Sequence, residues 1–124
     1  QPVVLYNGGA DLTYDTAPGA GVQGTVTLSE TAANFREITV FFTDDAGYII
    51  STTLPFPNGR GFGCFSGHGG NAGSSRSPGV ICAATYSVSG TTITKSGWFR
   101  HYDSNGFNAD REDYITIIRV EGRR

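Results

Sequence analysis

Residues 35–56 form the segment that most narrows the folds open to this chain. Apolar and mainly polar residues alternate along residues 38–43, which is the two-residue period of a strand with one buried face. Asp-Asp-Ala-Gly at residues 44–47 then supplies turn chemistry, because aspartate tolerates turn positions and glycine accepts a positive φ. A second β-prone run, residues 48–54, ends at Pro-Phe-Pro, since proline has no amide hydrogen to donate to a ladder. The pattern predicts a β-hairpin.

A second hairpin is predicted closer to the end of the chain. Its arms are residues 83–88 and 92–102, and Ser-Gly-Thr joins them. Gly97 interrupts the second arm, and an isolated glycine within a strand marks the expected place of a bulge.

Three further strands and one helical turn complete the expected elements. The strands are predicted at residues 3–6, 24–29 and 114–120, and the helical turn at residues 30–35. The last strand carries apolar residues on both faces, which is typical of a strand in the centre of a sheet. Ser29 is the expected cap of the helical turn.

Together these elements predict an all-β fold of seven or eight strands, either a sandwich or a small barrel, and we favour an antiparallel β-sandwich of the jelly-roll kind. The 18 glycines and the charged fraction of 16% favour turns over long amphipathic helices. A chain of 124 residues that is 38% hydrophobic fits a single domain, residues 1–124, with a core of its own. Because the chain contains no methionine and starts at Gln1, we expect it to be an excised or processed piece of a longer protein.

Residues 58–79 break the strand pattern with the run NGRGFGCFSGHGGNAGSSRSPG. The run is too rich in glycine to pack a core and too long for an ordinary connection, so we expect one long loop, either functional or disordered. The two cysteines, Cys64 and Cys82, enclose most of it. Two interpretations stay open. A disulfide would shape the loop and contribute about 3 kcal/mol by restricting the unfolded chain, whereas two buried thiols would act as small apolar residues.

Several functional classes lack their usual signatures. A net charge of −2 without a run of Lys and Arg argues against nucleic-acid binding, and no apolar run approaches the ~20 residues that span a bilayer. The sequence has neither zinc-type Cys/His spacing nor EF-hand spacing, so we expect no metal or other cofactor. Ser66, His68 and Asp103 could be assembled into a catalytic set, but no nucleophile signature accompanies them. We therefore expect a binding domain that is not an enzyme.

Two groups of residues are the candidate ligand contacts. The contacts expected in the glycine-rich run are His68, Asn71 and Arg76. Those expected in the second hairpin are Trp98, Arg100 and Tyr102. The second group shares one strand face because alternate residues point the same way, and flat rings beside a forked guanidinium donor suit sugars or peptides. The plainer alternatives are a solvated loop and a Trp98 that is the main core residue.

Three stretches of strand and turn follow one another in a familiar order. They are GTVTLSETAANFREITVFFTDDAGYIISTTLPFP at residues 24–57, YSVSGTTITK at residues 86–95 and DYITIIRVEGR at residues 113–123, after an opening Leu5-Tyr6. This order resembles the C-terminal domains of bacteriophage and prophage tail-fibre and tail-tip proteins. The glycine-rich run matches no fixed motif of that family.

The resemblance implies a receptor-binding tip domain, the C-terminal part of a longer protein, that attaches to a glycan or protein on a bacterial surface. It also implies a homotrimer without enzymatic activity, located in the phage tail of a virion or outside the cell. We expect the domain neither to bind nucleic acid nor to insert into a membrane. Two alternatives stay open: a structural domain that trimerises or caps a fibre or decorates a virion, and a carbohydrate-binding module of a secreted protein.

Overall fold

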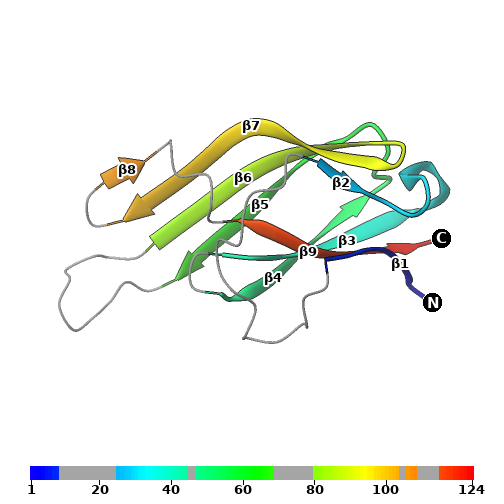
Figure 1. Ribbon diagram of the computed structural model, residues 1–124, viewed down its shortest axis with the longest axis horizontal. Helices are drawn as coiled ribbons and strands as arrows, with labels where there is room; N and C mark the ends of the chain where they lie inside the picture. Colours follow the sequence, from blue (N-terminus) through cyan, green and yellow to red (C-terminus); the bar gives the residue numbers. More distant parts are fainter. Residues whose placement is uncertain (9–24, 45–46, 69–79, 104–105, 109–114) are drawn as a thin grey trace.

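Two β-sheets face each other across the core (Figure 1). The structure, a computed structural model, describes residues 1–8, 25–44, 47–68, 80–103, 106–108 and 115–124, with only the backbone described at residues 68, 80, 97–103 and 106–108. These ranges contain nine strands and one short 3-10 helix, η1 (Ala32–Asn34). The strands are β1 (Val3–Asn7), β2 (Thr25–Thr27), β3 (Glu37–Thr43), β4 (Ile49–Pro55), β5 (Gly61–His68), β6 (Val80–Ser89), β7 (Thr92–Asp103), β8 (Gly106–Asn108) and β9 (Thr116–Arg123).

The strand order confirms the predicted all-β sandwich. One sheet has the order β1-β9-β3-β4, and the other has the order β2-β7-β6-β5 with β8 paired to β7. Every described strand pair is antiparallel. The first two strands lie at the edges of the two sheets, where β1 pairs with β9 and β2 pairs with β7.

Both predicted hairpins are present. β3 and β4 pair without interruption from Glu37↔Pro55 to Thr43↔Ile49. β6 and β7 pair along most of their length, and their register shifts between Ala84 and Tyr86. This irregularity lies opposite Gly97, where the isolated glycine predicted a bulge.

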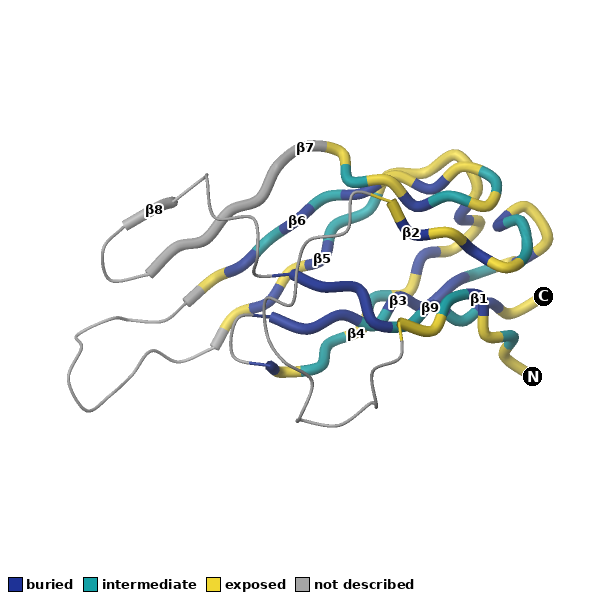
Figure 2. Tube along the Cα trace, in the orientation of Figure 1, coloured by how far each residue is buried: buried dark blue, intermediate teal, exposed yellow. Residues whose placement is uncertain are grey.

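The predicted central strand is also confirmed, since β9 lies between β1 and β3. Figure 2 shows that β3 and β9 are buried along most of their length. The core between the sheets takes Ile38, Val40 and Phe42 from β3, together with Tyr86 and Val88 from β6. The inward-pointing alternation of the first hairpin therefore supplies a large part of the core.

The glycine-rich run is not a loop along its whole length, which corrects the prediction. Residues Gly61–His68 form β5, an edge strand that pairs with β6 from Gly61↔Ser87 to His68↔Val80. Cys64 and Ser66 face inward and are buried, whereas Gly67 lies on the exposed face. The glycines give this segment a low strand propensity. Burial of its inward-facing side chains and pairing with β6 compensate for that low propensity. Residues 69–79 lie outside the described part of the chain.

The two cysteines are buried thiols rather than a disulfide. Cys64 pairs with Ala84, and Cys82 pairs with Ser66 on the neighbouring strand. The cysteines are therefore diagonal neighbours on the inward face, and diagonal positions in a sheet lie about 7–8 Å apart, beyond the usual Cα separation of a disulfide. Of the two interpretations of the sequence, the structure has the buried thiols, and burial raises the pKa of Cys64 well above its ordinary value.

The helical turn is present, but its cap differs from the predicted Ser29. The hydroxyl of Thr31 accepts a hydrogen bond from the amide of Ala33 at 3.3 Å. Ser29 instead donates its hydroxyl to the carbonyl oxygen of Val4, also at 3.3 Å. The turn begins two residues later than predicted, at Ala32, whose side chain is buried in the core.

Candidate functional site

A hollow of about 400 Å³ opens between the edges of the two sheets. We call it the β4–β5 hollow; its lining residues are Asp44, Tyr48, Ile50, Phe65, Ser66 and Gly67. One wall comes from the beginning of β4 and the residues just before it, and the other wall comes from the end of β5. These strand ends lie at the opposite end of the molecule from both termini (Figure 1).

Asp44 joins the two walls of the hollow. One carboxylate oxygen, Oδ2, accepts a hydrogen bond from the Ser66 hydroxyl of β5 at 2.5 Å. The other, Oδ1, accepts from the amide of Tyr48 at 3.0 Å. Asp44 is fully buried, and a buried carboxylate is tolerated only where hydrogen bonds replace its water. The carboxylate therefore fixes the turn before β4 against the edge strand of the opposite sheet.

The turn itself has the geometry that its residues predicted. The amide of Asp44 donates to the carbonyl oxygen of Tyr48, and the amide of Gly47 donates to the carbonyl oxygen of Asp44, both at 3.2 Å. Gly47 has a φ of 84°, the left-handed region that glycine enters without steric cost. The ring of Tyr48 is left 44% exposed at the mouth of the hollow.

Phe65 gives the hollow an exposed aromatic rim. Its side chain is 62% exposed although it belongs to a paired strand. The ring lies over Gly63, where a Cβ atom would collide with it. The absence of a side chain at Gly63 thus lets the ring pack directly on the backbone of the strand.

Ile81 extends this apolar surface onto the next strand. It is 55% exposed and pairs with Gly67, while Phe65 pairs with Ala83. Phe65 and Ile81 are consequently diagonal neighbours on the outward face of the sheet. We call Phe65, Ile81 and Ala83 the Phe65 surface. Two large exposed apolar side chains therefore lie close together on this face.

The sequence-predicted contacts lie beside this surface or outside the described residues. His68 ends β5 directly after Gly67, although only its backbone is described. Asn71 and Arg76 lie in the undescribed residues 69–79. The prediction for these two positions stays a prediction.

The second predicted group lies on β7, and two of its members fall in register with the Phe65 surface. Arg100 pairs with Ala83 and Tyr102 pairs with Ile81. The cross-strand rows are therefore Phe65–Ala83–Arg100 and Gly67–Ile81–Tyr102. The side chains of residues 97–103, including Trp98, are outside the description.

Sequence reasoning missed Phe65, Ile81, Tyr48 and Asp44. Phe65 was hidden in the run that was interpreted as a loop. The available signal was the spacing Phe62-x-Cys64-x-Ser66, in which the two intervening positions are one glycine and one phenylalanine. That period-two pattern indicates a strand whose outward face bears a single large ring.

Ser66 is the nucleophile that the sequence offered for a catalytic set, and its hydroxyl donates to Asp44 while the side chain is buried. Within the residues that the structure describes, no group of three or more His, Cys, Asp or Glu side chains is placed to hold a metal ion. Among those same residues, no helix has both the length and the apolar character needed to cross a membrane.

Comparison with known proteins adds no identification. No protein-family model matches the chain, and no curated protein matches it either.

Proposed function

We propose that this domain is a non-catalytic attachment domain that binds a glycan on a bacterial surface at the β4–β5 hollow. The observation that carries the proposal is the exposed ring of Phe65, held over Gly63 beside a hollow whose walls are tied together by Asp44. In this proposal the domain is the tip of a phage or prophage tail fibre, located in a virion or outside the cell. The resemblance of residues 24–57, 86–95 and 113–123 supports that setting.

Sugar recognition would explain why exposed aromatic rings and polar groups occur together at the β4–β5 hollow. One face of a pyranose ring presents C–H groups, which pack against a flat aromatic ring, while the hydroxyl groups around its edge need hydrogen-bond partners. Phe65 and Tyr48 provide exposed rings at the hollow, and the backbone of Gly67 lies open beside them. A rigid, preformed site loses little entropy when a ligand binds, and the Asp44 hydrogen bonds supply that rigidity.

The geometry of the molecule suits attachment. Both termini leave the same end, and the β4–β5 hollow lies at the other (Figure 1). A stem joined at the termini would therefore leave the hollow facing outward. We propose a homotrimer as the assembled form, as the resemblance implies, with a surface protein as the alternative receptor class.

Retention on bacterial polysaccharides tests the proposal. The purified domain is applied to an array of capsular polysaccharides and lipopolysaccharides, together with Phe65→Ala. We expect retention on a defined subset, and a loss of at least about tenfold in affinity for Phe65→Ala, or about 1.4 kcal/mol. Equal retention of Phe65→Ala would contradict the assigned site, and binding to no polysaccharide or intact cell would contradict the function.

One specific observation favours a second function. The Phe65 surface is apolar, and an apolar patch on an edge of a sandwich also suits contact between copies of the chain. In that case the domain would trimerise or cap a fibre without binding a receptor. The two functions differ in what Phe65→Ala removes: glycan retention in the first, and the oligomer in the second.

A further inference from the structure

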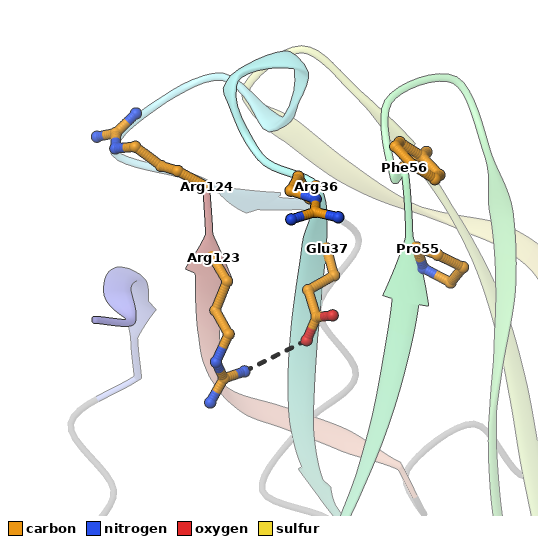
Figure 3. Close-up of a pocket in the computed structure, with 6 residues that line it drawn as sticks. All are labelled: Arg36, Glu37, Pro55, Phe56, Arg123 and Arg124. Atoms are coloured by element: carbon orange, nitrogen blue, oxygen red, sulfur yellow. Dashed lines mark ion pairs between the residues drawn. The ribbon is translucent and has the colours of Figure 1, made fainter.

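A second hollow, of about 340 Å³, lies at the other end of the sandwich. We call it the arginine hollow; its lining residues are Arg36, Glu37, Pro55, Phe56, Arg123 and Arg124 (Figure 3). They come from the start of β3, the end of β4 and the end of β9. The backbone brings these ends together, because Phe56 donates its amide to the Arg36 carbonyl oxygen at 2.6 Å and Arg36 donates its amide to the Arg123 carbonyl oxygen at 2.8 Å.

Positive charge collects in this hollow although the whole chain carries a net charge of −2. Arg124 is already engaged: it makes two contacts with the Glu30 carboxylate, at 2.7 and 2.9 Å, and lies 4.9 Å from the centroid of the Phe35 ring. Hydrogen bonds from Arg124 and Asn34 lower the pKa of Glu30, so this pair stays charged. The charge of Arg124 is therefore largely compensated.

The other two arginines are less well compensated. Arg123 lies 3.5 Å from the Glu37 carboxylate, which is long for a charge-assisted hydrogen bond, and it donates a long hydrogen bond of 3.4 Å to the Thr39 hydroxyl. Arg36 is exposed and makes no ion pair with any carboxylate in the described part of the chain. In Figure 3 the guanidinium group of Arg36 lies at the start of β3, above the Arg123–Glu37 ion pair. A guanidinium group that lacks an internal partner is ready to bind an external oxyanion in a two-point contact.

Phe56 is the second, independent sign of a ligand. It is 67% exposed and has a φ of 45°, and it is the single non-glycine residue with positive φ in the described ranges. A bulky side chain in the left-handed region is strained, and an exposed ring gains no burial in return. The buried neighbours Leu54 and Pro57 fix the backbone on both sides of it. Backbone strain of this kind is characteristic of sites that bind a ligand.

We propose that the arginine hollow binds an acidic sugar, through an oxyanion held by Arg36 and Arg123 and a ring face packed on Phe56. The ligand class is a pyranose that bears a carboxylate or a phosphate. Its negative charge meets the two under-compensated guanidinium groups, and its C–H face meets the exposed aromatic ring. The site is separate from the β4–β5 hollow, so this proposal does not rest on the proposed function.

Titration with simple sugars tests the proposal. Glucuronic acid, glucose 6-phosphate and glucose are added to the ¹⁵N-labelled domain, and the amide and arginine side-chain resonances are followed by NMR. We expect one or both acidic sugars to shift the resonances of the arginine hollow, and neutral glucose to leave them unchanged. The relative affinities of the two acidic sugars tell carboxylate from phosphate recognition.

Three variants make the test specific. Arg36→Gln and Phe56→Gly should each weaken binding of the preferred acidic sugar at least about fivefold. Arg60→Gln removes an exposed arginine that does not line the hollow, and it should bind as the unmodified domain does. Because glycine is at ease at a positive φ, Phe56→Gly should fold normally, which its NMR spectrum verifies.

The following outcomes would overturn the proposal. Neither acidic sugar shifts the resonances of the hollow, or Arg36→Gln binds with unchanged affinity. Equal losses in Arg60→Gln and Arg36→Gln would show general charge attraction instead of a site. If inorganic phosphate or a short glutamate peptide binds as tightly as the sugars, the hollow attracts anions without recognising a sugar ring.

Discussion

At the scale of single residues, glycines determine where side chains can pack against the sheets. Gly122 of β9 pairs with Ile38 of β3 and lies on the face of that sheet that packs against the core. A Cβ atom there would lie 2.6 Å from a ring carbon of Phe35 and 2.9 Å from Leu5. The absence of a side chain at this position therefore lets β9 approach Phe35 and Leu5.

We predict that Gly122→Ala lowers the free energy of unfolding by about 1–3 kcal/mol, which is the usual cost of overpacking a core. Gly61→Ala is the matched control, because the nearest atom to its Cβ would be the Tyr86 carbonyl oxygen at 3.6 Å. That control should be neutral or slightly stabilising, since alanine restricts the unfolded chain. Urea denaturation measures both variants, and equal stability of the two would contradict the packing argument.

At the scale of elements, the pairing of β5 with β6 is what the sequence alone did not predict. The β3–β4 hairpin was predictable because its strands are adjacent and joined by a turn with its own signature. β5 pairs with a strand across residues 69–79, and its glycines have little strand propensity. Only the non-local pairing makes it a strand.

The candidate site likewise divides into residues that local sequence pattern could predict and residues that only non-local pairing places. Arg100 and Tyr102 were predicted from alternation along β7, and the register sets them in the rows of Ala83 and Ile81. Phe65 was missed because an aromatic residue is exposed or buried according to which face of its strand meets the core. That choice is made by the pairing of β5, not by the local sequence.

The register of β5 and β6 also predicts the chemistry of the cysteines. Both are buried thiols, and burial raises the pKa of Cys64 so that little reactive thiolate forms. Without reductant, we expect neither cysteine to react with Ellman's reagent in the folded domain, and both to react in denaturant. No reaction in denaturant would reveal a disulfide, and rapid reaction of the folded domain would show that the thiols are accessible.

At the scale of the whole molecule, two hollows lie at opposite ends of one sandwich. The β4–β5 hollow lies away from the termini, and the arginine hollow includes the last two residues of the chain (Figures 1 and 3). The first is bordered by exposed rings and the second by exposed guanidinium groups. The two hollows therefore differ in charge, because arginines line only the second one.

The oligomeric state separates attachment from a purely structural role. If the Phe65 surface binds glycan, replacement of Phe65 by serine leaves the assembly of the domain unchanged, because the ring lies outside the contacts between copies. Sedimentation equilibrium of Phe65→Ser and of the unmodified domain measures this directly. Dissociation of a trimer into monomers in Phe65→Ser would assign the surface to self-association instead.

The most direct test of the central claim displaces the Phe65 ring without removing it. A Cβ at Gly63 would occupy the space of that ring, so Gly63→Ala must displace the Phe65 ring from its position on the strand backbone. Gly61→Ala adds the same atom on the same strand at an ordinary van der Waals distance, 3.6 Å from the Tyr86 carbonyl oxygen. We predict that Gly63→Ala lowers the affinity for the retained polysaccharide at least about tenfold, with an unchanged unfolding free energy, and that Gly61→Ala binds normally. Undiminished binding by Gly63→Ala would contradict the claim that the β4–β5 hollow is the glycan site.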